Sequence, residues 1–135
     1  MKIKYREGYK YQMAEDISIE TGIVLPSTVS NQFILLSSTG QLIVKSGYAW
    51  DGASKPAIDR MTNRGPSLPH DAMYQLGREL LLPAEFRAIA DALFRDMCIA
   101  NGMWKWVAWG EYYALRAFAG FAYKPRANET KEAPL

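Results

Sequence analysis

The spacing of apolar residues changes once along this chain, from the period of strands to the period of helices. In the first third, apolar and polar residues alternate in "KIKYR" and "ISIETGIVL", which is typical of half-buried strands. The run "QFILLSSTGQLIVKSGYAW" contains two apolar segments around a Ser-Ser-Thr-Gly turn and predicts a hairpin. We therefore expect residues 1–48 to be mostly strands, arranged as an antiparallel hairpin or a small sheet.

A loop is expected over residues 49–66, which are rich in Gly, Pro, Asp and Ser, and helical spacing begins after it. Ser67 can cap the first helix, and Pro69 is tolerated because amides in a first helical turn have no intrahelical partner. Gly102 is expected to end the second helix in a C-cap role. The three predicted helices span approximately residues 67–80, 83–101 and 104–120.

Strands followed by helices indicate an α+β fold, with the three helices packed as an antiparallel bundle against the small sheet. A length of 135 residues suits one domain, which we expect to cover residues 1–123, with its helices within 67–123. The remaining segment, residues 124–135, is polar and contains prolines, and it is expected to be a flexible tail.

Composition excludes several classes of protein. The net charge of +2 is too small to indicate a nucleic-acid partner. A single cysteine, Cys98, excludes an internal disulfide framework, and its place at the border of an apolar stripe predicts an inert buried thiol. The N-terminus lacks the apolar core of a signal peptide. Three charges interrupt the longest apolar stretch, residues 103–123, so no transmembrane segment is expected.

The segment "SLPHDAMYQL" contains the only histidine, His70. On a helix, His70 and Tyr74 share one face, and Asp71 points about 100° away from them. The first turn of a helix disfavours an imidazolium, and a neutral imidazole can accept a proton from water. His70 would become a useful general base if a carboxylate held its other nitrogen.

Three aspartates could supply that carboxylate: Asp91 on the second helix, and Asp51 or Asp59 in the loop. The short connection between the first two helices makes them antiparallel neighbours, so Asp91 can face His70. Asp71 would then be available, with carbonyl groups of the loop, to bind a hard cation such as calcium.

Four motifs in a fixed order resemble a phage and prophage family catalogued as domain of unknown function 1353. They are "GYAWDGASKP", "SLPHDAMYQL", "ADALF" and "YYALRAFAG", and together they cover roughly residues 47–121. This resemblance implies a phage or prophage origin, and it implies no particular activity.

A more distant resemblance is to phospholipase A₂, in which a glycine-rich calcium loop precedes a helix that reads His-Asp-x-x-Tyr. "HDAMY" is similar to that motif, and Gly52 stands eighteen residues before His70. Asp91 lies twenty-one residues after His70, in "ADALF", which looks like the Asp-x-x-Phe of disulfide-free viral members. The resemblance implies that His70 activates the attacking water and that Asp71 ligates calcium beside the Gly52 backbone. Asp91 and Tyr74 would then support the histidine.

Each of these residues also has a purely structural interpretation. His70 could bond a loop carbonyl at the start of its helix while Asp71 favours the helix dipole. Asp91 could form a surface ion-pair ladder with arginines at i±4, and Tyr74 could be a packing residue. For "WDGAS" we expect Trp50 in the core, followed by a tight turn at Asp51.

The third helix, rich in Trp and Tyr, could contact lipid at a membrane interface. Its aromatic residues occur all around the helical wheel, so we expect them to be buried against both the sheet and the other helices.

Two functions are consistent with this sequence. The first is a phage-encoded hydrolase, a calcium-dependent esterase acting on phospholipid, with a His70–Asp91 dyad and Asp51 as a further supporting residue. The second is a non-enzymatic phage accessory or virion component that acts through contacts with other phage proteins. Either would work in the host cytoplasm or in the virion.

Overall fold

The computed structural model of the protein describes residues 3, 5–6, 11–50 and 61–125. Strands precede helices, as predicted, so the fold is α+β. The strands are β1 (Tyr5–Arg6), β2 (Tyr11–Met13), β3 (Ile17–Glu20), β4 (Val29–Ser30), β5 (Ile34–Leu36), β6 (Gln41–Val44) and β7 (Ala49–Trp50). The helices are α1 (Met61–Arg78), α2 (Phe86–Ala100), α3 (Lys105–Phe118) and α4 (Gly120–Tyr123).

The strands form two antiparallel sheets, with the orders β1-β2-β7 and β3-β6-β5-β4. The predicted hairpin is confirmed as β5–β6, with Leu36 opposite Leu42. Its turn requires a glycine at position 40, where φ is +97° and an added Cβ would lie 2.5 Å from the carbonyl oxygen of Ile23. Only glycine fits both the backbone angle and this close approach.

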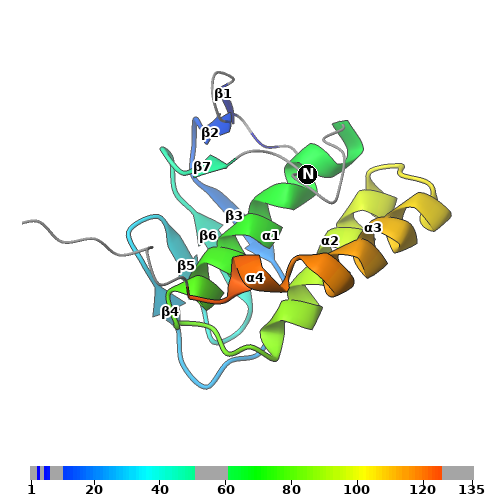
Figure 1. Ribbon diagram of the computed structural model, residues 1–135. Coiled ribbons are helices and arrows are strands. Elements are labelled where there is room, and N and C mark those ends of the chain that lie inside the picture. The colour runs from blue at the N-terminus through cyan, green and yellow to red at the C-terminus, as the bar shows by residue number, and fades with distance from the viewer. Residues whose placement is uncertain (1–2, 4, 7–10, 51–60, 126–135) are drawn as a thin grey trace, which may run out of the picture.

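The alternation predicted for the strands places alternate side chains in the core. Ile34, Leu36, Leu42 and Val44 are fully buried on one face of the four-stranded sheet. They belong to the same core cluster as Leu68, Met73 and Leu76 of α1. Helix α1 therefore lies between the strands on one side and α2 with α3 on the other (Figure 1).

Helix α1 begins at Met61, so the predicted start at Ser67 is wrong. The predicted loop over 49–66 is wrong at 49–50, which form β7, and at 61–66, which are helical, whereas residues 51–60 lie outside the described residues. Ser67 is not a cap but a buried residue inside the helix, where its hydroxyl bonds the carbonyl of Arg64. Trp50 Nε1 donates a hydrogen bond to the same hydroxyl at 2.9 Å. Tertiary burial of this turn outweighs a local sequence signal that is typical of a helix start.

The later helices lie within their predicted ranges, and Gly102, with φ of +99°, follows α2 as expected. One difference is that the third helix stops at Phe118 and the chain continues as the short helix α4. Tyr123 of α4 donates to the carbonyl of Pro83 at 2.7 Å and packs against Gly77, where an added Cβ would lie 2.4 Å from its ring. The end of the described chain is thereby fixed against α1.

The expectation that the aromatic residues of the third helix are buried is wrong. Helix α3 packs mainly on α2 and α4 and lies at the edge of the molecule away from the sheets (Figure 1). Only its inner positions, such as Ala108 and Leu115, are buried, whereas Trp106 is 71% exposed. No helix in the described residues is long and apolar enough to cross a membrane.

Candidate functional site

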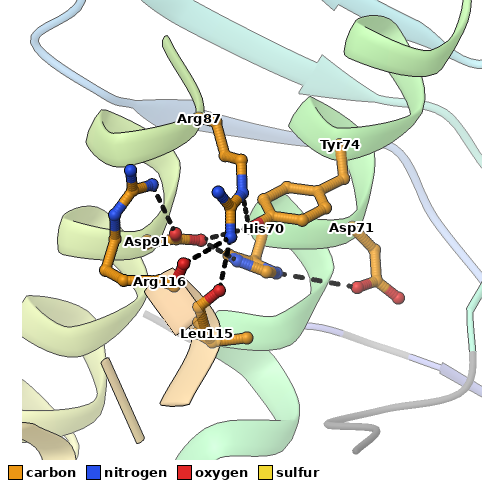
Figure 2. Close-up of polar contacts among 7 residues, drawn as sticks. All are labelled: His70, Asp71, Tyr74, Arg87, Asp91, Leu115 and Arg116. Carbon is orange, nitrogen blue, oxygen red and sulfur yellow. Dashed lines mark hydrogen bonds and ion pairs between the residues drawn. The ribbon is translucent and has the colours of Figure 1, made fainter. Parts of the chain in front are cut away.

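The contact between α1 and α2 brings His70 and Asp91 together (Figure 2). Nε2 of His70 lies 2.7 Å from Oδ1 of Asp91. The imidazole donates this hydrogen bond, because an ionised carboxylate can only accept. The pairing expected from antiparallel helices is therefore present in the structure.

Asp91 is the centre of a buried polar network. It is fully buried and accepts hydrogen bonds from three side chains. The hydroxyl of Tyr74 lies 2.6 Å from Oδ1, and Nη1 of Arg116 lies 3.0 Å from Oδ2. His70 supplies the third. These bonds compensate the cost of burying a carboxylate and join α1, α2 and α3 at one point.

The surface ion-pair ladder proposed for Asp91 is absent, and that interpretation is wrong. Arg95 pairs instead with Asp96, at 2.9 Å. Arg87 donates through Nε to the hydroxyl of Tyr74 at 3.1 Å, and its Nη2 reaches the carbonyl of Leu115. Arg87 thus supports the network indirectly, through Tyr74 and the backbone of α3.

Arg116 is a member of the site that the sequence reasoning missed. The available signal was weak: Arg116 is the one charged residue in the motif "YYALRAFAG", next to the buried Leu115. A single arginine on an aromatic helix does not reveal which carboxylate it meets, because that depends on how α3 crosses α2.

The second ring nitrogen of His70 faces Asp71 rather than Asp91 (Figure 2). Nδ1 lies 3.9 Å from Oδ1 of Asp71, within the range of an ion pair but beyond a direct hydrogen bond. The imidazole is 7% exposed and packs against Tyr74, with ring centroids 4.2 Å apart, and Phe94, at 5.3 Å. Asp71 is more accessible, with 32% of its side chain exposed, and it marks the wetter side of the histidine.

Two opposing effects set the pKa of His70. Burial lowers it, but the negative charge of Asp71, the hydrogen bond to Asp91 and the charge of Asp91 raise it, and the resulting pKa lies above the usual 6.5. Burial raises the pKa of Asp91, but the bonds from His70, Tyr74 and Arg116 reverse that effect and bring the pKa below 3.8. Burial and the bond to Asp91 raise the pKa of the Tyr74 hydroxyl, which therefore remains a donor. The network therefore favours the imidazolium form of His70 beside the ionised carboxylate of Asp91.

This pair predicts how stability depends on pH. Because the folded protein holds the His70 proton more tightly than the unfolded chain, its contribution is complete below pH 6.5 and is lost as pH rises through the folded pKa. We expect the free energy of unfolding to fall by about 1.4 kcal/mol for each pH unit between the two pKa values. Denaturant titrations from neutral to alkaline pH measure this slope, and His70→Gln should remove it. An equal slope in both proteins would contradict the assignment.

The other predicted site residues fall into two groups. Trp50 is 2% exposed and packs near Tyr11, with ring centroids 5.5 Å apart, so its predicted role in the core is confirmed. Asp51, Gly52 and Asp59 lie outside the described residues. Cys98 is buried, and burial raises the pKa of its thiol to about 12, in agreement with an inert side chain.

The calcium prediction depends on residues from two segments. Calcium takes six to eight oxygen ligands, of which Asp71 could provide one or two. Within the described part of the chain, no group of three or more His, Cys, Asp or Glu side chains is placed to hold a metal ion. Asp71 alone does not form a calcium site, so we derive no chemical step through a metal.

No protein-family model, curated protein or solved structure matches this chain. The resemblances to the phage family and to phospholipase A₂ therefore stay predictions. The site is defined by its own geometry: a buried His–Asp pair braced by a tyrosine and two arginines on an α+β fold.

Proposed function

We propose that this protein is a hydrolase of lipid carboxylic esters in which His70 is the general base and Asp91 orients it. The observation that carries the proposal is the 2.7 Å bond from Nε2 of His70 to Asp91, with Nδ1 directed to the other side, toward Asp71. A base needs one nitrogen held by an orienting carboxylate and the other directed at the reacting proton.

The proposed reaction begins with neutral His70, whose remaining proton is on Nε2 and is donated to Asp91. Nδ1 takes a proton from a water molecule as the water oxygen forms a bond to the ester carbonyl carbon. The imidazolium then returns that proton to the leaving alkoxide as the bond between the carbonyl carbon and the alcohol oxygen breaks. Asp91 keeps the proton of the neutral imidazole on Nε2 and stabilises the imidazolium once it forms, as the third group of a catalytic triad does.

Tyr74 and Arg116 are positioning residues in this proposal. Both donate to Asp91, so they fix the carboxylate that fixes the imidazole. Arg87 in turn donates to the Tyr74 hydroxyl. This arrangement keeps the orientation of His70 independent of the substrate.

Phospholipid is the proposed substrate because the motif "HDAMY" resembles phospholipase A₂ and because aromatic residues are exposed on α3. Calcium, through Asp71 and the Gly52 backbone, is part of that proposal. Asp51 would be a further supporting residue in the same segment. The resemblance to a phage family implies a phage or prophage origin, so the proposed activity would operate in the host cytoplasm or in the virion.

The dependence of the rate on pH tests the proposal. His70 must lose its proton to act as a base, so we expect phospholipid hydrolysis to rise with pH to a plateau, with a midpoint above pH 6.5. The assay follows release of fatty acid with calcium and, separately, with a chelator. Asp71→Asn should move the midpoint to lower pH, because Asp71 helps to raise the pKa of His70, and it should also lower the plateau rate measured with calcium, because it removes a proposed calcium ligand. No hydrolysis in either condition at any pH would exclude the proposed activity.

A second candidate function is a non-enzymatic phage accessory or virion component. It is supported by the same network, because Asp91 joins three helices and such a join could serve stability alone. This candidate predicts that the parent protein does not hydrolyse phospholipid and that the variants described here change only its stability.

A further inference from the structure

Helices α3 and α4, with Trp104 just before them, expose several large aromatic side chains to solvent. We call the following exposed residues the aromatic face: Trp104, Trp106, Trp109, Tyr113, Phe118 and Phe121. Five of them are 62–71% exposed, and Trp109 is 41% exposed. A soluble protein rarely exposes so many large aromatic groups within some twenty residues unless the surface binds something.

The aromatic residues support one another. Trp109 contacts Tyr113, with ring centroids 5.7 Å apart, and Trp104 contacts Trp106 at 6.1 Å. The guanidinium of Arg95, from α2, lies 4.1 Å above the Trp109 ring. These contacts hold Trp104 beside Trp106, and Trp109 beside Tyr113 and Arg95, so these rings are supported although they are exposed.

The charges that α3 and α4 themselves expose are positive, and on the adjoining α2 the exposed Asp96 is paired with Arg95, 2.9 Å away. Between residues 104 and 125 the charged side chains are Lys105, Glu111, Arg116 and Lys124. Glu111 is buried, the two lysines are exposed, and Arg116 is partly exposed. A partner of this face would therefore meet aromatic rings flanked by positive charge.

We propose that the aromatic face binds the surface of an anionic phospholipid bilayer. Trp and Tyr rings favour the boundary between headgroups and acyl chains, and lysines are attracted to anionic lipid. Helix α3 has 14 residues and would lie in the plane of the bilayer, since about 20 are needed to span one. A second copy of this chain fits less well, because a two-fold interface would bring together two faces that both expose positive charge.

This surface is separate from the proposed catalytic chemistry. Helix α3 also contacts the His70 site, through Arg116, which binds Asp91, and through the carbonyl of Leu115, which binds Arg87. Bilayer binding would bring that site to within about one helix diameter, roughly 10 Å, of the lipid. The proposed bilayer binding does not require His70 to be a base, so it can be correct even if the proposed hydrolysis is wrong.

Binding is measured by sedimentation with vesicles of ether-linked phosphatidylcholine, with and without phosphatidylglycerol. Ether-linked lipids have no acyl ester to cleave, so a failure to bind is distinguished from a failure to hydrolyse. We expect binding to the anionic vesicles, weakened at high salt. We expect the affinity for anionic vesicles to fall at least about ten-fold in a triple variant that combines Trp106→Ser, Tyr113→Ser and Phe118→Ser. Each substitution removes one large aromatic side chain, and burying one such side chain accounts for much of a ten-fold change in affinity.

Val24→Ser is the matched control, because Val24 is 78% exposed in the strand half of the chain and should leave binding unchanged. Lys105→Glu combined with Lys124→Glu should remove the preference for anionic vesicles. A second measurement needs no variant: the emission of the three exposed tryptophans should shift to shorter wavelength when anionic vesicles are added.

Two results would overturn the proposal. One is the absence of both vesicle binding and the emission shift in the parent protein. The other is a stable dimer in sedimentation velocity that the triple aromatic variant dissociates, because the aromatic face would then be an interface between copies.

Discussion

His70→Gln is expected to lower the rate of phospholipid hydrolysis by a factor of about 10² to 10⁴. In the parent protein Asp91 accepts a hydrogen bond from Nε2 of His70 at 2.7 Å, and the glutamine amide can replace that donor. The amide cannot act as a base, however, because it does not take a proton from water. The initial rate of fatty-acid release on the pH plateau of the parent protein measures the effect.

The control for this variant is Asp96→Asn, which removes a negative charge on α2 from a side chain that is 63% exposed and pairs with Arg95. It should leave the rate within about two-fold, because an exposed ion pair contributes little. Denaturant unfolding of both variants shows that each is folded. A folded His70→Gln protein that hydrolyses lipid at the rate of the parent would eliminate His70 as the base.

Asp91→Ala should produce the largest loss of stability, about 3 to 5 kcal/mol in the free energy of unfolding. The substitution leaves the His70 imidazole and the Tyr74 hydroxyl without the carboxylate that binds both of them. His70 is almost fully buried, so water cannot replace the lost acceptor without opening the contact between α1 and α2. Denaturant unfolding at pH 6, where the histidine is protonated, measures the loss.

Asp96→Ala is the matched control for stability, because it deletes the same carboxylate five residues later at an exposed position. We expect it to cost less than about 1 kcal/mol. A loss below about 1 kcal/mol in Asp91→Ala as well would mean that the buried network does not hold the helices together.

The sequence was informative wherever one local pattern sufficed. Two apolar runs around a Ser-Ser-Thr-Gly turn in "QFILLSSTGQLIV" predicted the β5–β6 hairpin, because a short turn between two apolar segments pairs them as neighbouring strands. The meeting of His70 and Asp91 was also predictable, since a short connection makes α1 and α2 antiparallel and leaves few registers for the pair. Trp50 was correctly expected in the core.

Other features needed information about distant parts of the chain. The start of α1 at Met61 depends on the burial of its early turns and on the bond from Trp50 to Ser67. The buried, ionised state of Asp91 depends on Arg116, twenty-five residues later in the sequence. Arg116 reaches Asp91 only because α3 crosses α2 at that point. The burial of Asp91 could not be deduced from the arginines at i±4, which bind elsewhere.

The sequence by itself determined the α+β order, the hairpin and the chemical identity of a His–Asp pair, because these depend on residues within one or two neighbouring elements. Only the tertiary structure decided that Asp91 is buried under Arg116 and Tyr74 and that the aromatic side chains of α3 face solvent. A helical wheel shows which residues share a face, but which face is covered depends on where the helix packs. Here α3 packs mainly on α2 and α4, so within the described residues most of its aromatic side chains stay exposed, and Arg95 of α2 covers part of Trp109 and Tyr112.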